Sequence, residues 1–328
     1  MHRPSTRDEH RYMFGERIVD LYRIVDHDCQ GDIAVLDGTS YSGGLVRINR
    51  LFMEADYKIT IGLVEPHFMA GFSGGPKTIC PGLSALKTIE NFHGYTFLSD
   101  PKVRVAVLDK NPCHKESVSV ASLAGVGFSI NLILDRHKRV VKAFAGNIFA
   151  AHEKACDYVR GHACPPVRGE ADVVVTGCGG YPLDATFYQC TKALVTALPC
   201  VRKSGQVIAA GGCVEGVGSG TYKAMLHKYN NDYHRFIEDI KAAGFIIKDQ
   251  WQIQMQARFD AWVGWENVHF YTHGIAPAEG TFLGVRTESV SAGEIAMQIQ
   301  AAIDSLERQG CSFAVLPEGP YCTPLTAV

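Results

Sequence analysis

Residues 56–95 read DYKITIGLVEPHFMAGFSGGPKTICPGLSALKTIENFHGY. The apolar run that ends near Val64 predicts a buried strand, a glycine-rich loop follows it, and an amphipathic helix is predicted from about Ser84. Loops at the carboxyl ends of parallel strands are where open α/β folds bind ligands. This stretch therefore predicts an α/β fold with a binding site in the loop.

Further runs of strand length alternate with helical patterns along the rest of the chain. They lie at 32–38, 103–109 and 128–134 in the first half, and at 171–177, 205–212, 267–274 and 311–317 in the second. Such alternation is typical of largely parallel sheets covered by helices.

Helix starts are predicted from capping residues. Asn111 before Pro112 predicts one start, Asn147 predicts another, and Ser291 with Glu294 predicts a capping box. The third helix has one apolar face, predicted to be core, made by Ile295, Ile299, Ile303 and Leu306.

The segment RGHACPPVRGEAD is the best candidate for a linker, because two prolines and a glycine fit neither a helix nor a central strand. We place a boundary near Pro165 and Pro166. This predicts a domain over residues 1–166 and a second over 167–328, with a cofactor cleft between them.

Composition limits the class of protein. The 328 residues are 46% hydrophobic and 20% charged, enough for one large core or two ordinary ones. The formal charge of -2 without a long run of either sign gives no footprint for nucleic acid or an anionic membrane, so we expect a small-molecule partner.

Localisation is predicted from two further features. The opening MHRPSTRDEHRY lacks the apolar core of a signal peptide, and no apolar run is long enough to span a bilayer. The 11 cysteines are scattered and never spaced as C-x-x-C, which favours reduced, mostly buried thiols. We expect a cytoplasmic protein without a membrane segment.

The glycine-rich loop has the composition of a phosphate site. Gly71, Gly74 and Gly75 allow bare backbone to approach a ligand, and Ser73 adds a hydroxyl group. The loop contains no G-x-G-x-x-G, and Lys77 lacks the spacing of a Walker loop. Ordinary nucleotide enzymes are therefore poor matches.

Three reactive side chains lie in the same stretch. His67, Lys77 and His93 offer a base, a point of covalent attachment and a metal ligand. Taken singly, they are more often a loop histidine bonded to backbone, a solvated lysine and a helix cap.

Together the motifs resemble those of the nickel-dependent lactate racemase family. EPHFMAGFSGGPKTICPG closely resembles the family's signature loop, NFHG follows at the family's spacing, and MHRP at the start also matches. In the second half, TGCGGYPLDATFYQCTKAL resembles the family's second-domain motif, and VLPEGPYCTP is similar to its ending. The resemblance covers essentially the whole chain.

The resemblance implies a specific cofactor. In the family, the lysine matching Lys77 carries a nickel-pincer nucleotide, a pyridinium mononucleotide whose two sulfurs and ring carbon hold nickel. The histidine matching His93 is the protein ligand to nickel, and those matching His2 and His67 are acid/base groups on opposite faces of the substrate. We expect Ser73, Gly74 and Gly75 to contact the cofactor.

The second-domain motif implies substrate contacts. Gln189 and Lys192 match residues near the substrate, and we place Tyr188 with them. Without the resemblance, this motif is a plain strand, turn and helix in which Lys192 is solvated.

The start of the chain departs from the family pattern. Members carry roughly a hundred residues, about one small domain, before the MHRP motif. These include an acidic residue and an arginine that help bind cofactor and substrate. We therefore expect a chain truncated at its N-terminus and poorly active or inactive as it stands, because His2 would be held weakly.

The implied activity is racemisation or epimerisation of a 2-hydroxy acid, lactate or a related acid, by reversible hydride transfer. Proteins that make the cofactor would be partners. Three alternatives stay open: an inactive cofactor-binding remnant, a racemase for another hydroxy acid, and a nicotinamide-dependent oxidoreductase. The last lacks the dinucleotide fingerprint.

Overall fold

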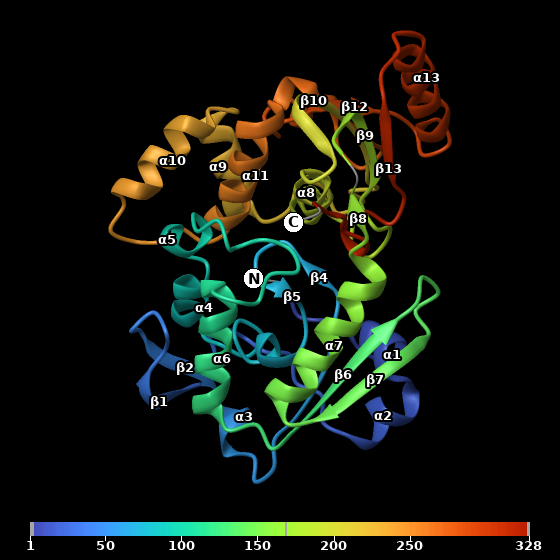
Figure 1. Cartoon of the computed structure of the whole chain (residues 1–328). Coiled ribbons are helices and arrows are strands. Elements are labelled where there is room, and N and C mark those ends of the chain that lie inside the picture. The colour runs from blue at the N-terminus through green and yellow to red at the C-terminus, as the bar shows by residue number, and fades with distance from the viewer. Residues whose placement is uncertain (1–2, 168, 327–328) are drawn as a thin grey trace.

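The computed structural model describes residues 3–167 and 169–326, which form two lobes (Figure 1). The first lobe contains α1 (Arg7–Phe14), α2 (Glu16–Leu21), β1 (Ile33–Thr39), β2 (Leu45–Asn49), α3 (Arg50–Glu54), β3 (Ile59–Leu63), β4 (Pro66–His67), β5 (Gly71–Phe72), the 3-10 helix η1 (Gly75–Thr78), α4 (Leu86–Phe92), α5 (Tyr95–Leu98), α6 (Pro112–Ala124), β6 (Phe128–Leu134), β7 (Val140–Gly146) and α7 (Ile148–Ala163).

The second lobe follows α7. Its elements are β8 (Pro166–Val167), β9 (Ala171–Gly177), α8 (Phe187–Ala197), β10 (Val201–Ala210), α9 (Gly220–Tyr229), α10 (Tyr233–Ala242), α11 (Gln250–Val263), η2 (Trp265–Asn267), β11 (Val268–Thr272), α12 (Pro277–Gly280), β12 (Arg286–Ser289), α13 (Ile295–Arg308), β13 (Phe313–Leu316), η3 (Gly319–Tyr321) and β14 (Leu325–Thr326). The predicted α/β class is confirmed. The boundary at Pro165 and Pro166 stays a prediction.

A five-stranded sheet forms the centre of the second lobe. Its strand order is β12-β11-β10-β9-β13, and every neighbouring pair is parallel. Helices α8 and α11 pack on one face of this sheet, and α13 lies against the other. The strand order reverses at β9, and open α/β sheets bind ligands beside such a point, at the carboxyl ends of the strands.

The largest sheet of the first lobe has three strands in the order β3-β6-β7 and is mixed. Strand β6 pairs parallel with β3 and antiparallel with β7, and α7 packs across it. The prediction that β3 is buried is wrong for one face, because Ile59, Ile61 and Leu63 are exposed while Thr60 is buried. The loop after β3 folds back through the β4–β5 hairpin into η1.

The predicted strand at 103–109 is wrong. This segment is a series of turns in which Val103 and Val105 are buried and Ala106 has a φ of 58°. Its carbonyl groups accept hydrogen bonds from side chains instead of a neighbouring strand: Arg258 donates to Val103 O, and Arg160 donates to Ala106 O. The apolar run therefore reflects burial between the lobes.

Two of the three predicted helix starts are confirmed in full. The Asn111 side chain accepts from the first turn of α6, and the Asn147 side chain accepts from that of α7. At α13 the capping box is only half formed, since the Glu294 carboxylate accepts from the Ser291 backbone but the Ser291 hydroxyl caps no N–H. The predicted core face of α13 is only half-buried, because the helix lies at the edge of the molecule.

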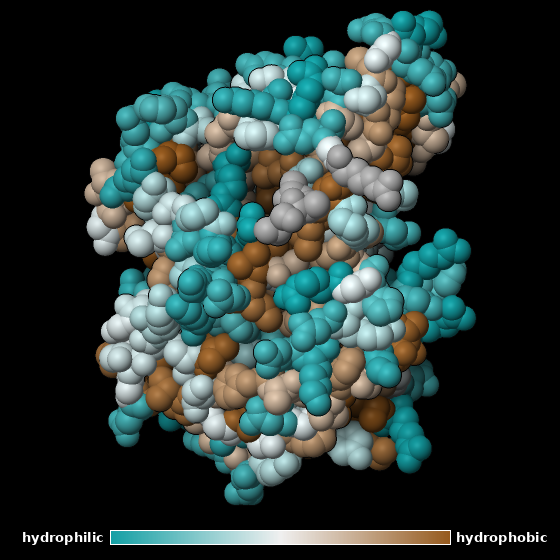
Figure 2. All heavy atoms as spheres, viewed as in Figure 1, coloured by the Kyte–Doolittle hydropathy of each residue, from teal (hydrophilic) through white to brown (hydrophobic). Residues whose placement is uncertain are grey.

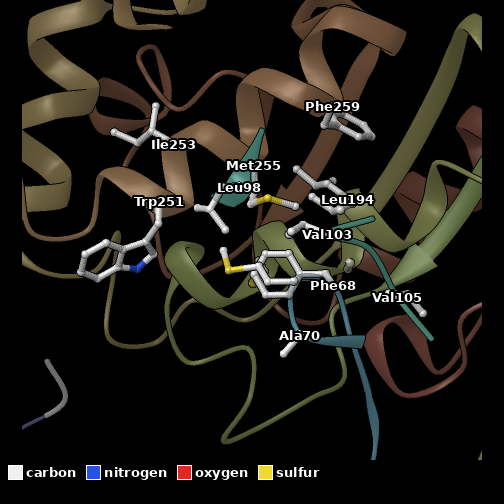
Figure 3. Packing of buried hydrophobic residues seen from close by; sticks show 14 of the residues in the cluster. Phe68, Ala70, Leu98, Val103, Val105, Leu194, Trp251, Ile253, Met255 and Phe259 are labelled. Atoms are coloured by element: carbon white, nitrogen blue, oxygen red, sulfur yellow. The ribbon is translucent and has the colours of Figure 1, made fainter. Parts of the chain in front are cut away.

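The two lobes share one apolar core. Figure 3 shows Phe68 and Ala70 of the first lobe beneath Leu194, Met255 and their neighbours from α8 and α11. Apolar side chains are visible in the hollow between the lobes in Figure 2. No helix within residues 3–167 and 169–326 is both long and apolar enough to cross a membrane.

Candidate active site

His67 lies in the hairpin that follows β3. Its Nδ1 accepts hydrogen bonds from the backbone N–H groups of Met69 and Ala70, each at 3.2 Å. Burial lowers the pKa of His67 well below its usual value, and the nearby positive charges of Lys77 and Lys192 and the His93 ring lower it further. His67 is therefore neutral, with its proton on Nε2.

Lys77 lies in η1, two residues after Gly75. Burial is the main cause that lowers the pKa of its amine from the ordinary 10.5. A lysine with a lowered pKa carries more of the neutral, nucleophilic amine at neutral pH. The local fold thus presents an amine suited to forming a covalent bond.

The predicted phosphate cradle is largely bonded within the protein. The Ser73 hydroxyl contacts Glu65 N and donates to Leu63 O, at 2.9 Å and 2.8 Å. The Gly75 N–H donates to Asn131 Oδ1 at 2.9 Å. Ser73, Gly74 and Gly75 therefore shape the loop in front of Lys77, and their contact with a cofactor stays a prediction.

His93 is the C-cap of α4 and is 7% exposed. Its Nδ1 lies 2.9 Å from Ile89 O, and because a carbonyl only accepts, Nδ1 carries the hydrogen. Burial lowers the pKa of His93 to about 3, so the ring is neutral, and the lone pair of Nε2 has no hydrogen-bond partner in the described part of the chain. The ring stacks on Trp251 with centroids 4.6 Å apart.

Helix α8 brings the second-lobe residues to the same place. The Tyr188 hydroxyl accepts from Trp251 Nε1 at 2.7 Å, which links α8 to the His93 ring across the lobes. Gln189 Oε1 is buried and has no hydrogen-bond partner among the described residues. Burial, with the charge of Lys77, lowers the pKa of Lys192 to about 8.

The charges at the site influence one another. Lys77, Lys192 and His93 lower the pKa of His67. The negative charge of Glu65 raises the pKa of Lys192. The structure therefore brings the predicted residues His67, Lys77 and His93 of the first lobe and Lys192 of the second into one polar cluster, which Glu65 joins. His2 lies outside the described residues.

A hollow of 630 Å³ opens next to α8, and its walls do not include His67, Lys77, His93 or Lys192. Its walls include Tyr188 and Gln189 from α8 and Arg3 and Glu9 from the N-terminal segment. Asp249, which is 4% exposed, also lines the hollow. A hollow of this size accommodates a small organic molecule.

Two family models match the chain. The lactate racemase N-terminal domain matches residues 1–106, and the lactate racemase C-terminal domain matches residues 167–263. Together these matches cover more than half of the residues. The chain belongs to the lactate racemase family.

Curated lactate racemases from two bacteria are similar to this chain. The protein of Thermoanaerobacterium thermosaccharolyticum is 36% identical over 261 residues, and that of Lactiplantibacillus plantarum is 36% identical over 259 residues. Each match covers 78% of this chain and 61% of the relative. The chain therefore spans about three fifths of the length of these lactate racemases.

Solved structures share the fold. The lactate racemase apoprotein of T. thermosaccharolyticum superposes with a TM-score of 0.84 at 29% identity, covering 99% of this chain and 76% of that one. A Thermotoga maritima protein superposes with a TM-score of 0.73 at 14% identity, covering 99% of this chain and 84% of that one. The second likeness shows the fold alone.

The sequence motifs did not identify three residues that support the candidate site, namely Trp251, Asn131 and His152. Trp251 contacts both His93 and Tyr188, while Asn131 and His152 contact the loop before Lys77. Each lies on an element distant in sequence from the residue it supports. A lone tryptophan, asparagine or histidine has no local pattern that marks such a contact.

Proposed function

We propose that this protein is a racemase or epimerase of a 2-hydroxy acid, lactate or a related acid, that works by reversible hydride transfer. The proposal assigns Lys77 as the covalent tether of a nickel-pincer nucleotide and His93 as the protein ligand to nickel. The observation that carries it is the free Nε2 of His93 in the same buried cluster as the Lys77 amine.

The chemistry of His93 suits a metal. Metal-binding histidines usually donate their second N–H to a carbonyl or carboxylate, and the Nδ1 contact with Ile89 O is of this kind. No group of three histidine, cysteine or acidic side chains suited to a metal occurs within the described ranges. This suits a metal whose other ligands come from the cofactor, and nickel suits sulfur with imidazole.

The chemistry of Lys77 suits the tether. Thioamide formation needs a neutral amine, and burial favours that form. When bound, the nucleotide would supply a cationic pyridinium ring that accepts the hydride from the substrate and returns it.

Lys192 and Gln189 suit the two polar ends of a 2-hydroxy acid. The Lys192 ammonium would hold the carboxylate by charge. Gln189 Oε1 accepts from no donor within residues 3–167 and 169–326, and a substrate hydroxyl would supply one. Tyr188 is held by Trp251 and would form part of the wall around the substrate.

His67 is proposed as one acid/base group, with His2 as the other. To take a proton on Nε2, a neutral histidine must carry its hydrogen on Nδ1. Here two amide N–H groups donate to Nδ1, so His67 is set to donate to a substrate oxygen. To act as a base, His67 would have to carry its hydrogen on Nδ1, which requires that the hydrogen bonds from the Met69 and Ala70 amides to Nδ1 break.

The main alternative is an inactive remnant of the family that binds the cofactor without turnover. The second alternative is a racemase that acts on another hydroxy acid. We further propose that the protein acts in the cytoplasm and that cofactor-making proteins are its partners. The balanced charge and a hollow of 630 Å³ support a small-molecule substrate over nucleic acid.

The test is expression together with the cofactor-making proteins of a lactate racemase system. Intact mass should show one added nucleotide per chain, and elemental analysis should show nickel. Each lactate enantiomer should then lose its optical rotation. Loading without turnover of lactate or other hydroxy acids would support the remnant, and no loading would overturn the proposal.

Substrate binding should depend on pH through Lys192. The lysine is charged below its pKa of about 8 and neutral above it, so binding of the carboxylate should weaken as pH rises. Beyond that pKa, KM should rise by up to about tenfold per pH unit, with kcat changing less. Because tethering removes the charge of Lys77, the midpoint should lie higher in the loaded protein.

The measurement is KM for lactate between about pH 6.5 and about pH 9.5. Lys192→Met should bind weakly and show a flat profile, whereas Lys203→Met at an exposed position should keep the wild-type profile. If Lys192→Met kept the wild-type pH dependence, another group would hold the carboxylate.

A further inference from the structure

His152 of α7 supports the loop that presents Lys77. It is 3% exposed, and its Nε2 lies 2.9 Å from Ser73 O. Because the carbonyl only accepts, Nε2 carries the hydrogen and donates it. A Cβ added at Gly75 would lie 2.2 Å from His152 Cγ, so the imidazole packs directly against the glycine backbone.

Asn131 of β6 supports the same loop at a second point. It is fully buried, its Oδ1 accepts from Gly75 N, and its Nδ2 donates to Ser129 Oγ at 3.2 Å. A Cβ at Gly74 would lie 2.8 Å from Leu63 O. The two residues before Pro76 are thus fixed on both sides by groups that leave space only for glycine.

Other bonds also hold this loop, because Ser73 N donates to Glu65 O at 2.9 Å and Thr78 Oγ1 donates to Gly75 O at 2.7 Å. A hollow of 770 Å³ lies behind it, with Pro76, His114 and His152 in its walls. Adjacent glycines have more conformational freedom than any other pair of residues. Without specific bonds, the Gly74–Gly75 backbone would sample several conformations and carry the Lys77 side chain with it.

We infer that His152 is a positioning residue that sets the direction of the Lys77 amine through its hydrogen bond to Ser73 O. This inference rests on the proposed role of Lys77 as the tether. The hydrogen bond from His152 to Ser73 O fixes the orientation of the peptide group between Ser73 and Gly74. Gly74 O in turn accepts a hydrogen bond from Lys77 N at 3.1 Å, so the position of this peptide group determines that of Lys77. His152 touches neither substrate nor cofactor in this assignment.

The experiment compares three variants of the full chain. His152→Leu removes the donor, and His152→Gln keeps an amide N–H near the position of Nε2. His114→Leu is the matched control, since the His114 ring stacks on His152 at 6.0 Å but makes no side-chain hydrogen bond to residues 71–79 in the described structure. Unfolding midpoints identify any variant that fails to fold.

Two measurements use the protein without cofactor. Hydrogen exchange reports residues 71–79, and a pulse of acetic anhydride with peptide mass spectrometry reports acetylation of Lys77 relative to Lys87. His152→Leu should speed exchange in the loop about five- to tenfold, the effect of losing one hydrogen bond. It should also change Lys77 acetylation severalfold. His152→Gln and His114→Leu should both resemble wild type.

A third measurement, intact mass after expression with the cofactor-making proteins, separates the two proposals. Slower loading of His152→Leu, with rescue in His152→Gln, supports the inference. Wild-type exchange and acetylation in His152→Leu, or equal changes in His114→Leu, overturn it. If wild type does not load cofactor, only the assignment of Lys77 as the tether is overturned. The two measurements without cofactor still test whether His152 positions Lys77. If His152→Leu does not fold, His152→Asn, whose amide falls short of Ser73 O, replaces it.

Discussion

Lys77→Ala is expected to abolish covalent attachment of the cofactor. A methyl side chain has no nucleophile, and His67 and His93 cannot form a thioamide. Intact mass after denaturation should fall from one nucleotide per chain to none. Racemisation should fall by at least about 10³, because an untethered ring loses the advantage of fixed proximity to the substrate.

The fold should survive this change. Folding lowers the pKa of Lys77 below the 10.5 of the unfolded chain, so at neutral pH the unfolded state binds the proton more tightly and the charge opposes folding. Removing the amine removes this unfavourable contribution to the free energy of folding. The unfolding midpoint of Lys77→Ala should therefore not fall because of the lost charge.

Lys87→Ala is the matched control. Lys87 lies on α4, is exposed, and pairs with Glu90 at 3.1 Å. Its variant should load and racemise as wild type does. If the Lys77 variant kept a nucleotide after denaturation, the tether would lie elsewhere.

The local parts of the fold were predictable from sequence. Asn111 and Asn147 cap α6 and α7 because their side chains accept from N–H groups two and three residues away, an interaction within a few residues. The parallel sheet of the second lobe was predictable because its strands are continuously apolar. The segment at 103–109 was not, since an apolar run indicates burial and cannot distinguish a strand from a buried turn.

The candidate site was predictable only where its residues share a motif. His67, Lys77 and His93 lie within one stretch of sequence and meet in one cluster. Trp251 of α11 contacts His93 of that cluster, and His152 of α7 contacts the loop before Lys77, both through tertiary packing. The hydrogen bonds that Ser73 and Gly75 make within the protein could not be predicted from sequence either, because their partners are backbone groups and an asparagine distant in sequence.

His93→Ala is expected to lose nickel while keeping the nucleotide. The two bonds are independent: the tether forms at Lys77, whereas coordination needs the lone pair of His93 Nε2. Even the loss of an outer partner of a metal ligand typically costs about 10- to 100-fold in metal affinity, so removal of the ligand should cost at least about 100-fold. Racemisation should fall with the nickel content.

A second variant separates coordination from packing. His93 is stacked on Trp251 and lies edge-on to Phe92, so alanine also leaves a void. His93→Phe keeps an aromatic ring at this position and has no nitrogen. Both variants should keep full nucleotide mass but lose nickel during dialysis against a chelator. His114→Ala, at a half-buried histidine with no assigned role, should keep both.

The outcomes discriminate between assignments. If His93→Phe kept nickel as wild type does, the metal would be held without this histidine, and the free lone pair would have another use. If both variants lost the nucleotide together with nickel, attachment would depend on the metal. Loss of nickel alone in both variants, with Trp251 still packed in a folded protein, is the result that the Nδ1 contact with Ile89 O predicts.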